Sequence, residues 1–471
     1  MSIHIYNSLT RKKEEFIPLN PPQVNIYTCG VTVYDESHIG HARSLYIFDV
    51  IRRYLKYKNF KVNFVRNITD IEDKIINRAR ELNLNWNELV EKYIKSYKED
   101  LALLGIKEGI LDGKEEPRAT RNIEEIKGFI QDLIDKGFAY VTKSGVYFSV
   151  RKFKDYGKLS GQSIDQMLTG VRKEPDETKA DPLDFALWKI SKVDEPFWES
   201  PWGKGRPGWH IECSVMSQKY LKINTLDIHA GGRDLIFPHH ENEIAQSEAK
   251  SGKPFAKYWL HHGLLTINGQ KMSKSLGNFI TIKDFINKYK DADLLKLFFL
   301  SAHYSSPIDY SDKEIDEAKK KMERISILVG TIQEKLKVLR YQPGVEENIQ
   351  IKYMREEFIN AMDDDFNTPK ALAVIFELVN RTNKNIDDLD FIYNAQKTLN
   401  ELLKILGISL ENMLARYSSV EKEIAALISE REKARKEKNY ALSDEIRKEL
   451  EEKGIILEDA KGGKTIWRKK I

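Results

Sequence analysis

The pattern of apolar and polar positions near the N-terminus predicts a strand, a loop, a helix and a second strand. Residues 24–27 alternate as a half-buried strand does, and residues 62–65 form a similar run. Between them, apolar side chains recur at the three-to-four spacing of a helix: Leu45, Phe48, Ile51 and Leu55. Such a unit belongs to an open parallel sheet, which binds ligands at the carboxyl ends of its strands. The loop over residues 28–41 therefore lies where a ligand would bind.

Further patterns predict a larger α/β protein whose C-terminal part is helical. Strand patterns end in glycine turns, whereas helices show apolar residues every three or four positions. After Asp312 the helical period continues almost to the C-terminus. The expected elements, in chain order, are a helix over 123–134, hairpin strands over 139–141 and 146–148, strands over 227–232 and 264–269, and helices over 315–339, 368–379 and 399–405.

Length and composition agree with a multidomain globular protein. The 471 residues exceed one ordinary hydrophobic core, and hydrophobic residues make up 41% of them. No secretory signal pattern is visible, and Lys296 interrupts the most apolar short run, so we predict a cytoplasmic protein with no membrane partner. The net charge of +4 is too small to indicate nucleic-acid binding by itself.

Two short segments offer chemistry for phosphate. His38 and His41 lie on the first turn of the predicted helix, where free amides and the helix dipole favour an anion. Gly40 lets a nucleotide approach the backbone closely. The lysines of the second segment, Lys271 and Lys274, suit a mobile polyphosphate. Taken singly, the histidines are more often a cap and a packing residue, and the lysines are more often part of a solvated loop.

Residues 38–41, His-Ile-Gly-His, and residues 271–275, Lys-Met-Ser-Lys-Ser, resemble in letters and order the two signatures of class I aminoacyl-tRNA synthetases. The resemblance implies an α/β fold with a class I Rossmann-type parallel-sheet catalytic domain, a connective insertion, an α-helical bundle and a small C-terminal anticodon-binding domain. It assigns the phosphates in the transition state to His38 and His41, and the departing pyrophosphate to Lys271 and Lys274. The residues it places against ATP are Gly40, Gly232, Asp234 and Lys274.

The two cysteines, Cys29 and Cys213, suggest a metal site. A disulfide is a poor interpretation in a cytoplasmic chain of this length, and isolated cysteines are usually small buried apolar residues. If residues 238–244 are helical, His239 and Glu243 project from one face and complete four ligands that zinc accepts. His240 with Glu243 is an alternative that spacing does not exclude.

The surroundings of these cysteines resemble the cysteinyl-tRNA synthetase family. The resemblance rests on Cys29 and residues 208–213 and 238–243, and extends to 67–70, 156–161, 361–369, 457–459 and 467–468. Glu72 departs from the family pattern, where Asp is more usual. The resemblance implies one zinc per chain, held by Cys29, Cys213, His239 and Glu243.

The resemblance also implies substrate contacts. Thr69, Trp209 and His229 would face the cysteine, although a structural role for His229 is equally consistent with the sequence. Trp467 stands in a basic tail, a composition typical of a base-stacking surface that would bind tRNA. The first three of the four tryptophans near the end of the insertion, Trp188, Trp198 and Trp202, are interpreted as packing residues.

Zinc has a chemical reason to be present in such an enzyme. A pocket distinguishes near-isosteres such as cysteine and serine by only ~1–3 kcal/mol. A zinc ion prefers the softer sulfur ligand and lowers the pKa of the thiol, so selection requires no separate editing domain.

The function implied by the resemblance is ATP-dependent activation of L-cysteine and its transfer to the 3'-terminal adenosine of tRNA(Cys). The partners are ATP with Mg²⁺, L-cysteine and tRNA(Cys), and the expected state is a monomer. Two alternatives remain: a ligase that passes cysteine to a small amine, and a non-catalytic zinc-stabilised RNA-binding protein. The expected divisions are 1–115 and 200–250 for the two catalytic halves, 116–199 for the insertion, 251–311 for the junction, 312–408 for the bundle and 409–471 for anticodon binding.

Overall fold

The computed structural model describes residues 2–106, 115–169, 178–273, 276–339, 348–452, 455–459 and 465–469. The chain divides into two compact units, which separate after Ser311. The segment Ala361–Thr368 belongs to the first unit although it lies far along the chain. Within that unit, Asp365 Oδ1 accepts hydrogen bonds of 2.9 Å from the backbone amide of Tyr6 and from the Tyr304 hydroxyl.

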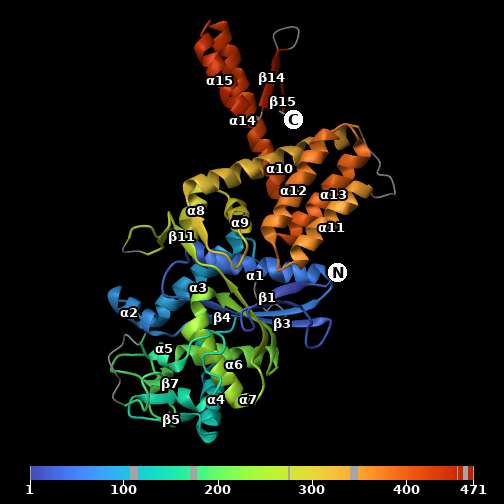
Figure 1. Ribbon diagram of the computed structural model, residues 1–471. Coiled ribbons are helices and arrows are strands. Elements are labelled where there is room, and N and C mark those ends of the chain that lie inside the picture. The colour runs from blue at the N-terminus through green and yellow to red at the C-terminus, as the bar shows by residue number, and fades with distance from the viewer. Residues whose placement is uncertain are drawn as a thin grey trace. The chain divides into compact units, whose positions relative to one another are not determined.

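A four-stranded sheet in the order β10-β9-β3-β4 forms the centre of the first unit (Figure 1). Its strands are β3 (Gln23–Thr32), β4 (Lys61–Thr69), β9 (Leu226–Gly232) and β10 (Ala256–His262). All three pairings are parallel, which confirms the predicted class of fold. Every residue of β9 is buried, as expected for a strand covered on both faces.

Helices follow the strands of this sheet. α1 (Ile39–Tyr57) connects β3 to β4, and its buried stripe contains all four predicted apolar residues. The other helices around the sheet are α2 (Asp73–Glu81), α3 (Trp86–Leu103), α6 (Trp209–Leu221) and α7 (Glu241–Ser251). A separate N-terminal hairpin consists of β1 (His4–Asn7) and β2 (Lys12–Glu15). These elements bring the loops after β3, β4, β9 and β10 to one edge of the sheet.

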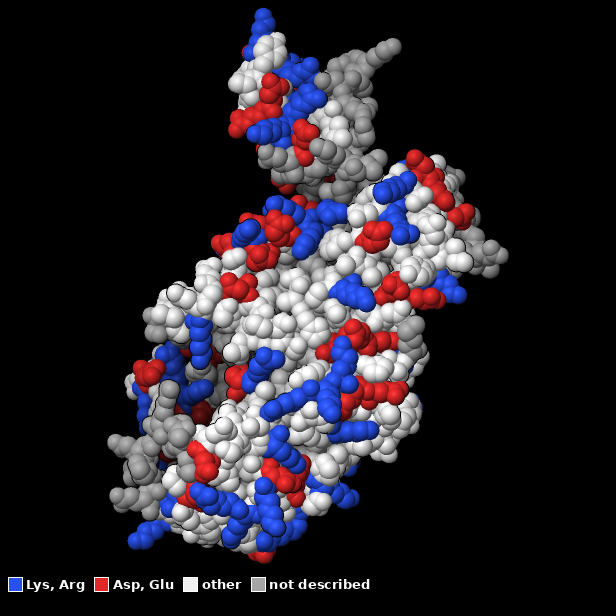
Figure 2. Space-filling model, in the orientation of Figure 1, with Lys and Arg blue, Asp and Glu red and all other residues white. Residues whose placement is uncertain are grey.

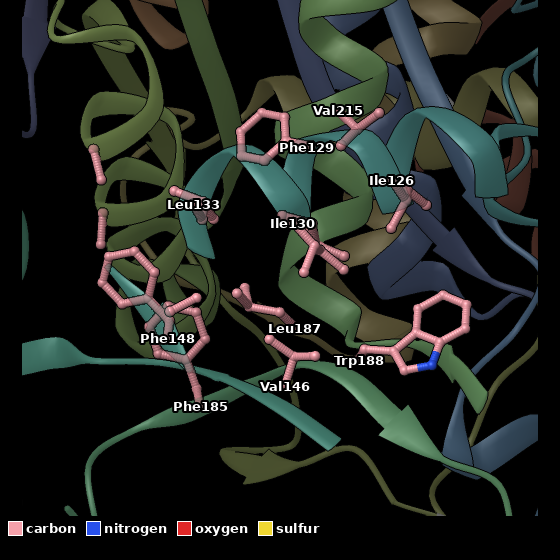
Figure 3. Close-up of a cluster of buried hydrophobic side chains, with 14 of the residues drawn as sticks. Ile126, Phe129, Ile130, Leu133, Val146, Phe148, Phe185, Leu187, Trp188 and Val215 are labelled. Carbon is pink, nitrogen blue, oxygen red and sulfur yellow. The ribbon is translucent and has the colours of Figure 1, made fainter. Parts of the chain in front are cut away.

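The chain between the two halves of the sheet has its own antiparallel sheet, in the order β5-β6-β7-β8. The strands are β5 (Ala139–Val141), β6 (Gly145–Phe148), β7 (Phe185–Ile190) and β8 (Gly205–Pro207), and the accompanying helices are α4 (Ile123–Asp135) and α5 (Ile164–Thr169). Figure 3 shows Ile130 and Leu133 of α4 packed over Val146, Leu187 and Trp188. Trp198 and Trp202 pack against the same cluster, so the structural interpretation of these three tryptophans is confirmed.

A smaller three-stranded sheet follows the central one and carries the second signature. It contains β11 (Leu265–Ile267), β12 (Gln270–Lys271) and β13 (Ile308–Tyr310). Asn268 and Gly269 have φ angles of 49° and 75°, so the predicted Asn-Gly tight turn joins β11 to β12. Two helices complete this region: α8 (Ile282–Tyr289) and α9 (Ala292–Leu300).

The second unit is mainly helical, as its apolar period predicts. Its helices are α10 (Asp312–Val338), α11 (Ile349–Asp363), α12 (Thr368–Lys384), α13 (Leu389–Ile405), α14 (Leu410–Lys436) and α15 (Tyr440–Glu452). The charged run near residue 435 belongs to α14 and is largely exposed. The chain then forms an antiparallel pair, β14 (Ile455–Asp459) and β15 (Thr465–Lys469). Among the described residues, no helix has the length and apolar character needed to cross a membrane.

Candidate active site

The two histidines of the first signature begin α1 and bond to each other's backbone. His38 is the N-cap residue: its Nδ1 accepts a hydrogen bond of 3.2 Å from the amide of His41. In return, His41 Nδ1 accepts from the amide of His38 at 3.3 Å, and the two rings stack with centroids 3.7 Å apart. The sequence prediction that both residues lie on the first helical turn is confirmed.

Both imidazoles are neutral in this arrangement. Burial lowers the pKa of His38 to about 4 and lowers the pKa of His41 well below its usual value. Because each Nδ1 accepts an N–H from the backbone, the ring proton lies on Nε2. Each histidine therefore offers one Nε2–H donor to a ligand without adding a full positive charge.

The second signature lies beside the first. The amide of Ile39 donates to the carbonyl of Ile280 at 3.1 Å, and the amide of Ile282 donates to the carbonyl of Ser37 at 2.9 Å. A Cβ atom on Gly40 would lie 3.4 Å from Met272 Cε. Lys271 is exposed at the end of β12, whereas Lys274 lies outside the described residues. The described parts of the two signatures thus lie side by side, as a shared phosphate site would require.

An irregularity in the pairing of β3 with β4 positions Cys29. The register shifts between Thr28 and Val31, and the amide of Gly30 donates to Asn67 Oδ1 at 2.9 Å. A Cβ atom on Gly30 would lie only 1.5 Å from the carbonyl oxygen of Asn67, so the residue after Cys29 must be glycine. Cys213, on α6, has its Sγ atom 3.6 Å from the same Asn67 Oδ1.

The four residues proposed as metal ligands come together. The ligand atoms of Cys29, Cys213, His239 and Glu243 all lie within 4.8 Å of one another. His239 lies in a π-helical turn (Ile236–His240) before α7 rather than within a regular helix, and its Nε2 is 2.9 Å from Glu243 Oε1. Two sulfurs, an imidazole and a carboxylate are ligands that zinc accepts. The donor set therefore fits a zinc ion.

A second set of possible ligands overlaps the first. Cys29, His229, His240 and Glu243 also lie within 4.8 Å of one another. Here Cys29 Sγ is 3.3 Å from His240 Nε2, and His229 Nε2 is 2.7 Å from Glu243 Oε2. This set has one sulfur instead of two. The sequence left open His240 in place of His239 as a ligand. The geometry allows this alternative, but its set of ligands contains one cysteine, whereas the first set contains two.

The members of the first set differ in charge: burial raises the pKa of the Cys29 thiol well above its usual value, and Glu243, against the effect of burial, raises the pKa of His239 to about 10. Burial opposes charge on every member, yet hydrogen bonds from Cys29 and His239 lower the pKa of the Cys213 thiol to about 6. Glu243 is fully buried, and the nearby His229 and His239 nevertheless hold its pKa well below the usual value. Both groups are thus poised to be anionic near neutral pH, the form in which they bind a metal.

The proposed cysteine-contacting residues surround this cluster. The Trp209 ring stacks on His239 with centroids 4.1 Å apart. Thr69 is buried at the end of β4, and its hydroxyl donates to Glu212 Oε2 at 2.9 Å. His229 is fully buried behind Glu243, with its ring stacked on Trp259 at 4.5 Å. This arrangement favours an orienting role for His229.

The residues proposed for the adenosine lie at the carboxyl end of β9, which stands between β3 and β10 in the sheet. Gly232 ends β9, and it pairs with His262 of β10. Asp234 follows on an exposed turn, and a Cβ atom on Gly232 would lie 2.4 Å from its Oδ1 atom. The Asp234 carboxylate thus lies against the backbone of Gly232, in space that any side chain at position 232 would occupy.

Some residues that support the site were not singled out from the sequence. Asn67 touches both Gly30 and Cys213, and Glu241 accepts hydrogen bonds from the amides of Gly157 and Ser160 at 2.9 and 2.8 Å. In the sequence, the only indication of a role for these two residues is that they belong to segments 67–70 and 238–243, which resemble the family. Trp467 lies opposite Leu457 in the β14–β15 pair, and its side chain is outside the described part of the structure.

The fold matches solved class I aminoacyl-tRNA synthetases. A methionyl-tRNA synthetase of Mycobacterium tuberculosis, in complex with methionyl-adenylate, superposes with a TM-score of 0.63 over 82% of this chain and 90% of that one. The ternary LeuRS–tRNA–LeuAMS complex of Agrobacterium radiobacter K84 gives 0.62 over 84% and 86%. At 15% and 10% identity these likenesses concern the fold alone. The protein therefore has the fold of a class I aminoacyl-tRNA synthetase.

The sequence comparisons identify the family within that class. The family model "tRNA synthetases class I (C) catalytic domain" matches residues 15–320, "DALR domain" matches 357–411, and "Cysteinyl-tRNA ligase anticodon binding domain" matches 418–468. The chain is 50% identical to the cysteine–tRNA ligase of Thermodesulfovibrio yellowstonii and 47% identical to that of Aquifex aeolicus, over 100% of this chain and at least 99% of each relative. The chain belongs to the cysteine–tRNA ligase family.

Proposed function

We propose that this protein activates L-cysteine with ATP and transfers it to tRNA(Cys), with one zinc ion selecting the amino acid. The observation that carries the proposal is the convergence of two sulfurs, one imidazole and one carboxylate beside the paired signature segments. A protein that only bound RNA would not need a soft metal site next to a phosphate-binding helix. We also propose that it acts as a monomer in the cytoplasm.

The first step requires little covalent chemistry from the protein. The substrate carboxylate attacks the α-phosphate of ATP, and pyrophosphate leaves; positioning and charge stabilisation supply most of the rate enhancement. His38 and His41 donate Nε2–H hydrogen bonds to the phosphate oxygens as charge develops. Lys271 and Lys274 follow the departing pyrophosphate, and Mg²⁺ accompanies the ATP. Gly40, Gly232 and Asp234 accommodate the nucleotide.

In the second step a ribose hydroxyl of the terminal adenosine attacks the activated carbonyl, and AMP leaves. Bound zinc supplies a preference for a thiolate over a hydroxyl. Trp209 and Thr69 form walls of the cysteine pocket, and His229 holds the carboxylate of Glu243. These roles explain why Cys29, Cys213 and Glu243 lie close together although they belong to β3, α6 and α7.

The test is cysteine-dependent exchange of pyrophosphate into ATP, together with zinc analysis. We expect about one zinc per chain and exchange with cysteine but not serine. Cys213→Ser should lose most of the zinc, because a hydroxyl is a poor zinc ligand. A protein purified without chelator that contains no zinc would contradict the metal assignment.

The same assay separates the alternatives. Exchange without any charging of tRNA would favour the ligase that uses a small amine as acceptor. Absence of exchange in folded, zinc-loaded protein would favour the non-catalytic RNA-binding alternative. The complete C-terminal match to an anticodon-binding domain supports tRNA as the acceptor.

A further inference from the structure

A cavity of about 470 Å³ opens between the described parts of the two signatures, and its walls include Tyr34 and Lys74, to which no role has been assigned. Residues from three segments line it: the chain after β3, helix α2 and the start of the second signature. Tyr34 and Lys74 stand on its wall together with His38 and Phe279. The cavity therefore touches both signature segments directly and combines aromatic rings with a cation.

The topology separates this cavity from the proposed adenosine residues. Gly232 and Asp234 lie at the end of β9, next to β10, whereas α2 follows β4 at the opposite side of the sheet. β3, which leads into His38, lies between them. A nucleotide in the cavity would thus be a second one, with the reacting phosphates between the two.

Lys74 is the cation in this cavity that is available to a ligand. Its Nζ atom lies 5.7 Å from the centroid of the Tyr34 ring, and the side chain is exposed. It forms no ion pair among the described residues. Its charge acts on the signature helix, because it contributes to the lowered pKa of His41. Lys74 therefore faces the reaction centre rather than bulk solvent alone.

Arg78, one helical turn further along α2, has a different role. Its Nη1 atom is 2.9 Å from Glu81 and its Nη2 atom is 3.6 Å from Asp35. These carboxylates neutralise most of its charge, so Arg78 fixes the wall of the cavity. An anion entering the cavity would be attracted mainly by Lys74.

We propose that this cavity receives the unpaired 3' end of the tRNA, with Tyr34 as a stacking surface and Lys74 as the partner of a backbone phosphodiester. The inference rests on the proposed function and specifies one of its substrate contacts. Single-stranded RNA is bound in this way, by aromatic rings that stack on bases and by cations that contact the backbone. ATP phosphates are the other possible source of the same anion, and the experiment distinguishes them.

The test uses the full-length protein with Lys74→Met and a matched control, Arg80→Met. Arg80 lies on the same helix, is exposed and pairs with Glu195 at 3.3 Å, but does not line the cavity. Cysteinyl-adenylate is formed first, and single-turnover transfer is then measured against the concentration of a tRNA(Cys) transcript. For Lys74→Met we expect the half-saturating tRNA concentration to rise about tenfold, with a salt dependence reduced by about one phosphate contact.

Two further measurements determine which anion Lys74 contacts. Pyrophosphate exchange without tRNA should change less than twofold in Lys74→Met; a loss equal to that in transfer would assign Lys74 to ATP and overturn the proposal. Binding of a tRNA that lacks its unpaired 3' nucleotides should be equally tight for wild type and variant. Weakening that persists with this shortened tRNA, or no difference from Arg80→Met, would also overturn it.

Tyr34→Leu provides an independent variant. It should weaken transfer in the same direction, because a leucine side chain cannot stack on a base as the Tyr34 ring does. If wild-type protein fails to exchange pyrophosphate with cysteine, the proposed function itself is wrong. Normal wild-type charging with unaltered Lys74→Met and Tyr34→Leu proteins would instead reject only the assignment of this cavity.

Discussion

Single buried charges set local properties that can be measured, and Asp100 on α3 is an example. Its side chain is fully buried, and neither carboxylate oxygen has a hydrogen-bond partner among the described residues. Burial raises the pKa of Asp100 to about 7, partly offset by Lys283. An unfolded Asp has a pKa of about 3.9. The folded state therefore binds the extra proton between these two values, and the free energy of unfolding falls as pH rises through that window.

We predict that Asp100→Asn stabilises the protein more at pH 8 than at pH 5. The variant removes the penalty of a buried charge, which amounts to about 2 kcal/mol after allowance for solvent screening. Urea denaturation at the two pH values measures the difference. Glu99→Gln is the control, since Glu99 is half exposed in its pair with Lys283 at 2.9 Å. An equal gain at both pH values would contradict the assigned pKa.

Lys271 gives a second prediction at the residue scale. Lys271→Ala should slow adenylate formation while zinc content and fold remain unchanged, because it removes a charge needed mainly in the transition state. Lys274→Ala is expected to act in the same direction. Pyrophosphate exchange at saturating substrates measures the effect, and Gln270→Ala, exposed on the same short strand, is the control. Exchange equal to wild type would show that the loop has another role.

Among the elements, the junction of β3 and β4 determines where Cys29 lies. We predict that Gly30→Ala lowers both stability and zinc content, because its Cβ atom would lie 1.5 Å from the carbonyl oxygen of Asn67 and force the strands apart. Thermal unfolding and elemental analysis measure the two effects. Gly128→Ala, on α4 with nothing within 4 Å of the added Cβ, is the control and should stabilise by up to about 1 kcal/mol. A Gly30→Ala protein with full zinc content would show that the junction of β3 and β4 does not determine the geometry of the metal site.

Helix α1 also connects the two signatures through one buried residue. Arg43 is fully buried and donates hydrogen bonds to the carbonyls of Gly263, Leu264, Tyr304 and Ser306, at 2.6 to 3.3 Å. Burial lowers its pKa to about 10, so it remains charged. Gly263 and Leu264 precede β11, which leads into Lys271, and Tyr304 and Ser306 precede its neighbour β13. The relative positions of the two signature segments thus depend on this guanidinium.

At the scale of the molecule, charge alone does not reveal a tRNA surface. Lys and Arg side chains are interspersed with Asp and Glu over the face of the first unit seen in Figure 2. This agrees with the small net charge of +4. Recognition of tRNA must therefore depend on local contacts, such as those proposed for Lys74 and for the C-terminal tail.

We predict that Trp467→Ala weakens charging by roughly ten- to a hundredfold, as expected for loss of one base–aromatic stack worth ~1–3 kcal/mol. The loss should appear in the Michaelis constant for tRNA, and pyrophosphate exchange without tRNA should be unchanged. Tyr440→Ala is the control, an aromatic residue of the same unit that is 63% exposed. A folded Trp467→Ala protein with normal tRNA kinetics would exclude Trp467 from recognition.

The sequence by itself determined the elements and the class of chemistry. Alternation over residues 24–27, the apolar stripe of α1 and Asn268-Gly269 each specify local structure, because side-chain spacing and backbone preference act over a few residues. The two signatures and the types of the proposed metal ligands were likewise visible as letters in order.

Only the tertiary structure decided which of these residues meet. Cys29, Cys213 and Glu243 lie on β3, α6 and α7, so their distances depend on strand order and on the shifted register beside Gly30. His239 and His240 are adjacent in sequence, yet each belongs to a different set of possible ligands. Lys74 joins the signature region only because α2 packs beside it. Contacts between distant segments arise from packing of whole elements, and no spacing along the chain encodes them.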